Sequence, residues 1–460
     1  MEEPVKRCGG FSEDDLISRL PDALISQILL YLPTKEAVRT SVLSSRWESV
    51  WLLIPVLELK SSEFPSSNAF VGFMEKFVAL AKVENSCLHK VKLSIRKDDE
   101  SENNMSCVRR WVDFVATNKL KHLDVECVLV KRECLEVMPL SLYFSQKLVY
   151  LRLHCVSLVG FESVSIPCLK TMHLEKNVYA NEKCLESLIS SCPVLEDLSI
   201  VRKVDDNVDV LRVVSKTLTS VRVAFDFGKH KIELYGFDRL NSGVSIDAPR
   251  LKHLTFRKEP SASKVVTISG SLAKVEITGY FDIQLDDEVG LPVNQMACNF
   301  FTGILRVRDM KISHSALERI TSYFQTQESA PRFCNLSYLE AQFFFSSAKI
   351  LSTILESCPN LKSFVMNIDY STLIAPISFA SVPHCLLSSL EFVKIIRIYN
   401  GEPVNIEVPK YFLENAVILK KLVVHLSCTV RHRNSPIDLD DLLALPKRSS
   451  MCQIVPVVDR

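Results

Sequence analysis

The sequence predicts an α/β fold: a small N-terminal helical module, then an irregular solenoid of parallel strands and helices, then a related C-terminal segment. Three observations support this prediction. Apolar residues recur with helical spacing near the N-terminus, a strand-like motif repeats downstream, and 47% of the 460 residues are hydrophobic against 24% charged. At roughly 150 residues per domain, the length allows two to four domains or one repeat array with an appendage.

The first helices are predicted after a polar stretch, residues 1–14, which we expect to be disordered. Pro21 and Asp22 form a helix-start pair, and Pro33 ends that helix. Thr34 is a plausible N-cap for a second helix. The first helix carries one apolar stripe: Leu24, Ile25, Ile28, Leu29 and Leu32. The second helix and the end of the module carry Ala37, Val38, Ser41, Val42, Trp47 and Trp51.

A module of about 45 residues buries too little surface to cover all of these apolar side chains by itself. A groove on another protein is one place for the remainder. The alternative is that the module packs on the downstream domain. Periodicity alone does not separate these two interpretations.

A motif of the form L-x-x-L-x-L recurs after residue 61, with conservative replacements. Its spacing averages about 28 residues, within the range of leucine-rich repeats. Each copy predicts one short strand that buries its apolar face only by stacking on its neighbours. The copies are Leu88/Val91/Leu93, Leu120/Leu123/Val125, Leu148/Leu151/Leu153, Leu169/Met172/Leu174, Leu195/Leu198/Ile200, Leu218/Val221/Val223, Leu251/Leu254/Phe256, Leu272/Val275/Ile277, Leu336/Leu339/Ala341, Leu361/Phe364/Met366, Leu390/Val393/Ile395 and Leu419/Leu422/Val424. The long interval before Leu336 predicts one degenerate copy around Leu305 and Val307.

The best internal match aligns LISSCPVLEDLSI (188–200) with ILESCPNLKSFVM (354–366). In both segments, an apolar helical turn ends at Ser-Cys-Pro just before the strand. Cys192 and Cys358 are therefore expected to be small buried hydrophobes at a helix-to-strand corner.

Composition argues against several classes of function. A net charge of +1 provides no general field for nucleic acid or an anionic membrane, although local patches remain possible. The sequence shows no signal-peptide core and no apolar run long enough to span a bilayer. The odd number of 15 cysteines then indicates free thiols in a reducing compartment, the cytoplasm or nucleus.

No catalytic, metal or cofactor site is predicted. The chain lacks the phosphate-binding glycine motifs, a C-x-x-C pair, G-x-S-x-G and H-E-x-x-H. A thiol enzyme with one active cysteine remains an alternative, because 15 cysteines and 10 histidines make a chance pair common. A row of histidines on the outward strand face is more typical of a solvated row than of a metal or pH-sensitive site: His122, His154, His173, His253 and His425.

The outward strand face is instead a candidate surface for a protein or peptide target. Side chains next to the buried leucines point away from the core. They mix charge with aromatic rings, which suits a protein partner better than a small anion. The candidate target-binding residues are Tyr150, Arg152, His173, Asp197, Arg222, Arg257 and Tyr338.

The quoted motifs resemble those of a known family. LPDALISQILLYLPTKEAVRTSVLSSRWESVW is similar to the F-box of plant F-box proteins, and the Ser-Cys-Pro-x-Leu repeats resemble the leucine-rich repeats of the same proteins. VPHCLLSSLEFVKIIRIYNGE and PKYFLENAVILKKLVV resemble the FBD domain. The resemblance implies the following segments: a disordered N-terminus (1–14), an F-box (15–60), leucine-rich repeats (61–376), an FBD domain (377–452) and a tail (453–460).

The resemblance also implies a function. Such a protein is a non-catalytic substrate-recognition subunit of an SCF-type cullin-RING ubiquitin ligase, and its F-box docks on a Skp-family adaptor that links it to the cullin and the RING protein. The repeats and FBD region hold a protein target, with no role for nucleic acid, membrane or cofactor. A repeat scaffold without target turnover is a second possibility. The implied adaptor-binding residues are Leu20, Pro21, Leu24, Ile28, Leu29, Leu32, Val42 and Trp47.

Overall fold

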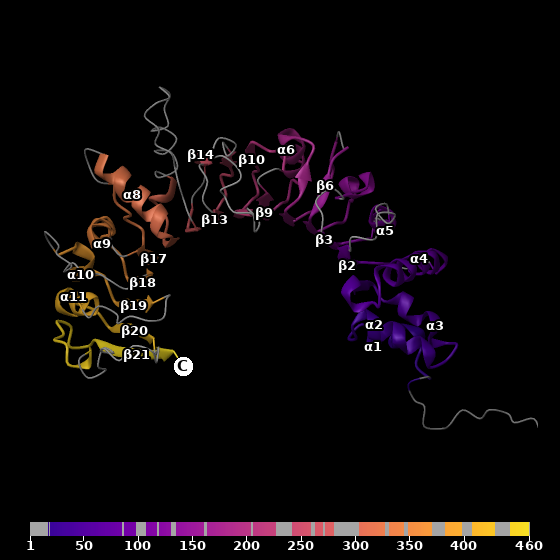
Figure 1. Cartoon of the computed structure of the whole chain (residues 1–460), viewed down its shortest axis with the longest axis horizontal. Coiled ribbons are helices and arrows are strands. Elements are labelled where there is room, and N and C mark those ends of the chain that lie inside the picture. Colours follow the sequence, from indigo (N-terminus) through magenta and orange to yellow (C-terminus); the bar gives the residue numbers. More distant parts are fainter. Residues whose placement is uncertain are drawn as a thin grey trace, which may run out of the picture. The chain divides into compact units, whose positions relative to one another are not determined.

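A computed structural model gives a mixed α/β fold dominated by parallel sheet (Figure 1). It divides into two compact units, residues 1–173 and 174–460, and β7 (Thr171–Glu175) spans the boundary. The structure describes residues 17, 19–84, 87–97, 107–116, 119–129, 135–160, 163–203, 206–226, 242–258, 263–269, 272–279, 303–326, 331–344, 348–369, 382–397, 407–427 and 442–459. The predicted disordered stretch 1–14 lies outside these residues.

The first unit begins with short helices and continues as a parallel sheet with strand order β1-β2-β3-β5. Core residues align across this sheet, so that Leu57, Val91 and Leu123 are successive neighbours on one face. Helices α4 and α5 cover that face (Figure 1). The elements are α1 (Asp22–Leu29), α2 (Thr34–Arg39), η1 (Thr40–Val42), α3 (Trp47–Val50), η2 (Trp51–Leu53), β1 (Val56–Lys60), η3 (Ser61–Glu63), α4 (Ser67–Val83), β2 (Lys90–Lys97), α5 (Cys107–Val115), β3 (His122–Leu129), β4 (Glu136–Val137), η5 (Leu140–Phe144), β5 (Tyr150–His154) and β6 (Val156–Leu158).

The helical module is joined directly to this sheet, because β1 follows η2 after two residues. The Glu58 backbone N–H donates to the Thr34 hydroxyl at 2.9 Å, and Lys35 Nζ donates to the Glu63 carbonyl at 3.0 Å. Trp51 packs its ring against Phe73 and Phe77 of α4, with centroid distances of 6.2 and 5.8 Å. The module therefore covers the outer edge of the first strand, where an unpaired N–H would otherwise remain.

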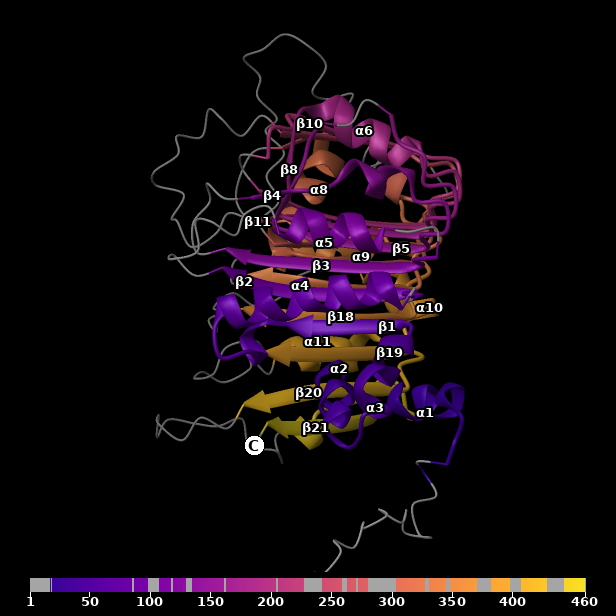
Figure 2. The same ribbon diagram turned by 90° about the vertical axis from the view of Figure 1, so that its right-hand side faces the viewer.

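The second unit repeats the same plan. Its strands follow the order β9-β11-β13-β15-β16-β17-β18-β19-β20-β21, all parallel, and Figure 2 shows β18, β19 and β20 pointing the same way. Helices α8 to α11 all lie on one face of its later strands (Figure 1). The elements are β8 (Val178–Tyr179), α6 (Glu182–Ser190), β9 (Asp197–Lys203), β10 (Val210–Val214), β11 (Ser220–Asp226), β12 (Ser242–Asp247), β13 (His253–Lys258), β14 (Ser263–Ser269), β15 (Lys274–Gly279), β16 (Asp309–Ile312), α8 (His314–Thr326), β17 (Tyr338–Phe344), α9 (Ala348–Glu356), β18 (Ser363–Asp369), α10 (His384–Ser388), β19 (Phe392–Arg397), α11 (Glu407–Asn415), β20 (Lys421–Ser427) and β21 (Gln453–Asp459).

Each of the twelve predicted motifs coincides with a strand of a parallel sheet, from β2 to β20. The degenerate copy exists, but its position was predicted two residues too early. Met310 and Ile312 are the buried residues of β16, and Val307 is buried just before that strand. Cys192 and Cys358 are buried just after α6 and α9, which confirms their corner positions. The sequence pattern did not predict the small second sheet β10-β12-β14.

The predicted tail (453–460) is wrong for residues 453–459, which form β21 and pair with β20. The Gln453 N–H donates to the Lys420 carbonyl at 2.9 Å, so every second residue from Gln453 points its backbone polar groups toward β20. Pro456 lies in the alternate set and faces the free edge, where its missing N–H removes no ladder bond. Within the described strands, β21 ends the order of this unit, and Pro456 blunts that edge.

We expect Pro456→Val to increase self-association, because it restores an N–H donor in the middle of an exposed strand edge. Multi-angle light scattering over a range of protein concentrations measures this effect. Pro446→Val is the matched control, since Pro446 is exposed and lies outside the strands. A Pro456→Val protein that stays as monomeric as the control would contradict the edge-blocking role.

Candidate functional site

The helical module fills its interior with its own side chains. Ile25 and Leu29 of α1 are buried with Ala37, Trp47 and Val50. Arg46 fixes the start of α1, because its Nη2 and Nε donate to Asp22 Oδ1 at 2.7 and 3.0 Å. It also donates to the Leu20 carbonyl. The module is thus packed without any partner protein.

A second set of apolar side chains on the same helices remains exposed. Leu24, Ile28 and Leu32 follow a four-residue spacing, and their exposed fractions are 44%, 45% and 42%. Val42 and Leu43, at the end of η1, are exposed as well. We call Leu24, Ile28 and Leu32 the α1 stripe. Burying such side chains contributes about 1.5–3 kcal/mol each when complete, so the stripe is a candidate protein-docking surface.

The predicted adaptor-binding residues divide into two groups in this structure. Leu24, Ile28, Leu32, Val42 and Pro21 are exposed, and Leu20 is half-buried. Leu29 and Trp47 are only 2% and 6% exposed, so the expectation that they lie at the docking surface is corrected. Leu29 follows the apolar spacing of the first helix, and Trp47 lies at the end of the module, but both side chains face the module's interior. Their contribution is to hold α1 and α3 in place.

In the first unit, the outward face of the sheet carries a stack of rings. His122 stacks on Tyr150 with centroids 4.0 Å apart and planes within 4°, and Tyr150 meets His173 edge-on at 5.4 Å. Burial, together with the charge of Lys90, lowers the pKa of His122. The imidazole is therefore held neutral near pH 7, which favours stacking. This ring row brings together two predicted target-binding residues, Tyr150 and His173.

An ionic row lies beside the rings. Asp124, although buried, accepts from Arg152 Nη1 at 3.0 Å and pairs with Lys92 Nζ at 3.4 Å. These residues come from three adjacent strands, β2, β3 and β5. The pairing fixes the position of Arg152, a predicted target-binding residue, beside Asp124. Rings and fixed charges together suit a polypeptide partner better than a small ion.

The second unit scatters the remaining predicted target-binding residues along its outward face. Asp197 is half-buried, and Arg222 and Arg257 are exposed. Arg257 Nη2 binds Glu276 at 3.2 Å, and Tyr338 Oη donates to Glu340 at 3.3 Å. Burial opposes ionisation of Glu340, yet hydrogen bonds from Lys311, Asn367 and Tyr338 hold its pKa below the ordinary value. These residues are held in place by neighbours, and they are not gathered into one site.

Three buried thiols of the described residues are poorly suited to act as nucleophiles. Burial raises the pKa of Cys192 and of Cys385 to about 12, and it raises the pKa of Cys358 well above the usual value. The thiolate is the reactive form, so these three groups are poor nucleophiles at neutral pH. Cys87 Sγ lies 3.4 Å from His89 Nε2, the kind of chance pair that the composition predicted.

Neither a cluster of metal ligands nor a membrane-spanning helix occurs in the described part of the chain. No three His, Cys, Asp or Glu side chains converge there as metal ligands would. The histidine row does not assemble a metal site. No described helix has the length and apolar character needed to cross a bilayer.

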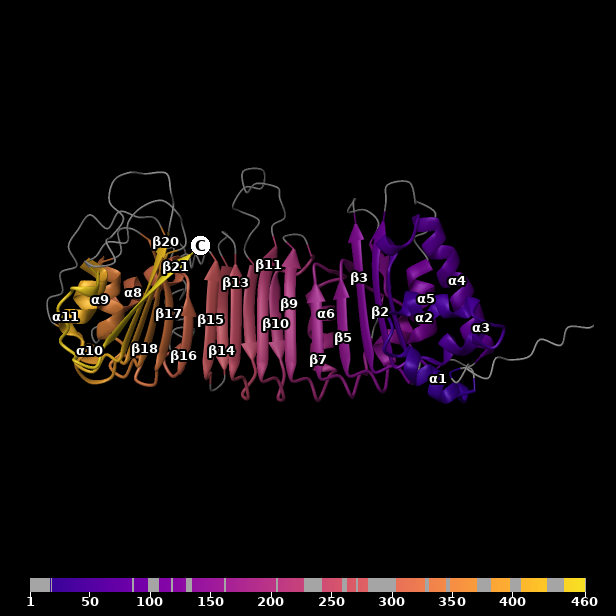
Figure 3. The same ribbon diagram turned by 90° about the horizontal axis from the view of Figure 1, so that it is seen from below.

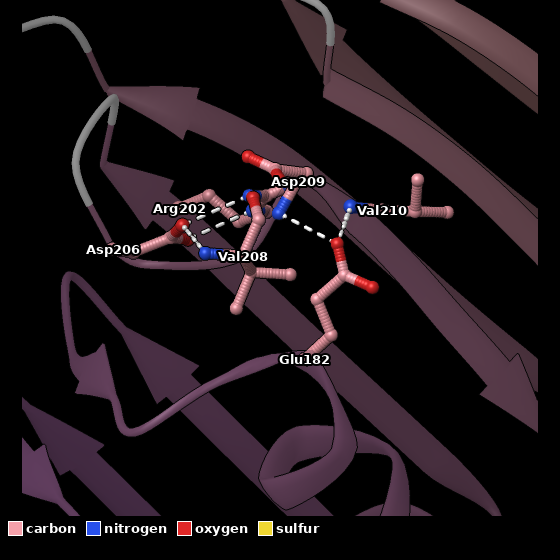
Figure 4. Close-up of polar contacts among 6 residues, drawn as sticks. All are labelled: Glu182, Arg202, Asp206, Val208, Asp209 and Val210. Carbon is pink, nitrogen blue, oxygen red and sulfur yellow. Dashed lines mark hydrogen bonds and ion pairs between the residues drawn. The ribbon is translucent and has the colours of Figure 1, made fainter.

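A buried clamp in the second unit was missed by the sequence pattern (Figure 4). Arg202 occupies a core-facing position of β9, and its Nε and Nη2 donate to both carboxylate oxygens of Asp206 at 2.8 Å. It also donates to the Val208 carbonyl and lies 5.2 Å from the Phe225 ring centroid. Glu182 then accepts from the N–H groups of Asp209 and Val210 at 3.0 and 2.8 Å, which positions the start of β10.

Three family models match the sequence: an F-box domain over residues 17–58, the leucine-rich repeats of an FBD-associated F-box protein over 108–289, and FBD over 378–424. The chain is 60% identical over 462 residues to FBD-associated F-box protein At5g44490 of Arabidopsis thaliana, covering 100% of this chain and 95% of the relative. It is 56% identical over 445 residues to FBD-associated F-box protein At5g22730 of the same plant, covering 96% and 94%. It is also 41% identical over 446 residues to F-box/FBD/LRR-repeat protein At5g22700 of Arabidopsis thaliana, covering 96% and 97%.

We expect Asp206→Ala to lower the free energy of unfolding by about 3–5 kcal/mol, because it leaves the Arg202 guanidinium buried without its partner. Chemical denaturation measures the loss. Glu276→Ala removes the partner of the exposed Arg257 and is the matched control, with an expected cost of at most about 1 kcal/mol. Equal costs for the two variants would contradict the clamp's structural role.

Proposed function

The chain belongs to the plant F-box proteins that carry leucine-rich repeats and an FBD domain, and on that premise we propose that it is the substrate-recognition subunit of an SCF-type cullin-RING ubiquitin ligase. The helical module docks on a Skp-family adaptor, which links it to the cullin and the RING protein. The repeat and FBD regions hold the target, which is then ubiquitinated. We place this activity in the cytoplasm or nucleus.

The observation that carries the proposal is the exposure of the α1 stripe on a module with a complete interior. Leu29 and Trp47 already fill the core, so Leu24, Ile28 and Leu32 are not needed for folding. Three half-exposed leucine or isoleucine side chains at helical spacing match the anchors of helix-in-groove recognition. Pro21 and Leu20 lie just before this stripe and are proposed to contact the adaptor with it.

The proposed mechanism requires no chemistry from this chain. Holding a target beside the ligase raises the effective concentration of its lysines near the ubiquitin-charged enzyme. The ring row of His122, Tyr150 and His173 is the best-organised surface for such a target. Arg152, pinned by Asp124, extends it. These residues act in binding, and none of them acts in catalysis.

Two alternatives are distinguishable by experiment. A thiol enzyme would form a thioester with ubiquitin in vitro, and we expect none, consistent with the raised pKa values of Cys192, Cys358 and Cys385. A scaffold without target turnover would leave target levels unchanged when the protein is removed, whereas we expect a target to accumulate.

We expect Leu24→Asp with Ile28→Asp to abolish capture of a Skp-family adaptor while the chain remains folded, because both side chains are exposed in the free protein. Pull-down with purified adaptor measures the binding, and circular dichroism checks the fold. Leu80→Asp is the matched control, since Leu80 is an exposed leucine on α4, outside the module. Leu20→Ala with Pro21→Ala should weaken the same capture.

Undiminished adaptor binding by the folded double aspartate variant would refute the docking proposal. Binding of the target by the repeat and FBD regions is tested separately, by affinity capture with the proteasome blocked. Adaptor and cullin should disappear from the double-variant sample, while the target remains.

A further inference from the structure

The strands of the second unit begin along one border of the sheet, seen at the lower side in Figure 3. Five lysine and arginine residues lie along this border. Arg250 and Lys252 lie just before β13, and Arg306 and Arg308 lie just before β16. Lys362 directly precedes β18. All five side chains are exposed. We call them the basic edge: Arg250, Lys252, Arg306, Arg308 and Lys362.

Backbone hydrogen bonds fix the spacing of these cations. The Ala273 N–H donates to the Lys252 carbonyl at 2.8 Å, and the Arg308 N–H donates to the Ala273 carbonyl at 2.8 Å. The chain of bonds continues through Ser337 to Lys362 at 2.9 and 3.0 Å. A cation therefore recurs on every second strand. Strands lie about 4.8 Å apart, which places Lys252, Arg308 and Lys362 about 10 Å from one another along a line.

The charges of the basic edge are not neutralised by ion pairs within the described part of the chain. The nearest carboxylate along the border, Glu391, already binds Lys420 Nζ at 2.8 Å. This pairing first, and the charge of Lys362 to a smaller extent, lower the pKa of Glu391. Asp309 follows Arg308, but it lies on the outward face of the sheet in register with Lys274. A chain of net charge +1 thus concentrates positive charge on one border.

Beyond the Glu391–Lys420 pair, the same border becomes apolar. Ile418 lies three residues before β20, and Met451 lies two residues before β21. Leu387 lies nearby, because the Val417 N–H donates to the Leu386 carbonyl at 2.9 Å. Leu387, Val417, Ile418 and Met451 are all exposed, Met451 by 73%. We call these four residues the apolar end of the border.

We infer that this border binds an extended polypeptide segment in which regularly spaced acidic residues are joined to apolar residues. The charge of the basic edge complements carboxylates, and the apolar end complements leucine-like side chains. A polyproline II segment advances about 3.1 Å per residue, so acidic side chains at every third residue recur at about 9 Å on one face. That repeat matches the spacing of Lys252, Arg308 and Lys362.

The linear arrangement argues against other anions. A compact polyphosphate needs converging cations, whereas these cations are spread along about 20 Å. Nucleic acid would leave the apolar end unused. Direct binding of a peptide to this border does not depend on adaptor docking by the helical module.

The test uses the full chain and a fluorescein-labelled peptide of about 12 residues, with aspartate at every third position followed by two leucines. Fluorescence anisotropy measures the affinity at low and high salt. We expect binding that weakens with salt and that is lost when lysine replaces the aspartates. Replacing the leucines by serine should weaken it further.

Arg308→Glu with Lys362→Glu should bind the peptide about tenfold more weakly, as expected for the loss of exposed charge pairs and the gain of repulsion. Lys121→Glu with Lys147→Glu is the matched control, because it makes the same charge change at exposed lysines of the first unit. Met451→Asp should reduce the preference for the leucines. Thermal melts confirm that each variant is folded.

Three outcomes would overturn the inference. The first is no measurable binding of the wild-type chain, and the second is equal loss in the control and test variants. The third is competition by a single-stranded oligonucleotide of the same charge at the concentration of the unlabelled peptide, which would identify a general polyanion site.

Discussion

The fold depends on one constraint: a single strand of this chain cannot bury its apolar face alone. Leu198, Val221 and Leu254 are buried because they lie in register on neighbouring parallel strands. Each added strand therefore completes the core of the one before it. The same constraint leaves the two outermost strands exposed on one edge. Thr34 covers the edge of β1 with its hydroxyl, and Pro456 blunts the edge of β21.

This constraint frees the outward faces for binding, because the core needs only every second residue of a strand. His122, Tyr150 and Arg152 occupy the alternate positions, and their neighbours hold them in fixed orientations. Arg202 departs from this arrangement, since it lies on the core side of β9 and requires Asp206 to neutralise it. Arg202 on the core side is therefore structural, whereas the exposed polar residues on the outward side are available to a target.

The periodic features could be predicted from the sequence, and the non-periodic ones could not. Repeated leucines predict strands because each position faces the same core, and the spacing of Leu24 and Ile28 predicts one face of a helix. Periodicity does not separate Leu29 from Ile28, because both fall on a broad apolar stripe and only packing decides which is buried. Strand β21 was missed because Pro456 is a strand breaker except at an edge.

The total charge of the chain, like the periodicity of its sequence, does not reveal how the side chains are arranged in space. A net charge of +1 argues against a general polyanion field. However, the sum does not record where the charges lie. On the outward faces, opposite charges alternate across strands, as in Lys92, Asp124 and Arg152, and they neutralise one another locally. Along the basic edge, uncharged Ala273 and Ser337 separate Lys252, Arg308 and Lys362, so no carboxylate compensates them within that row. Local segregation of charge, which the total conceals, is what makes that border selective for an acidic partner.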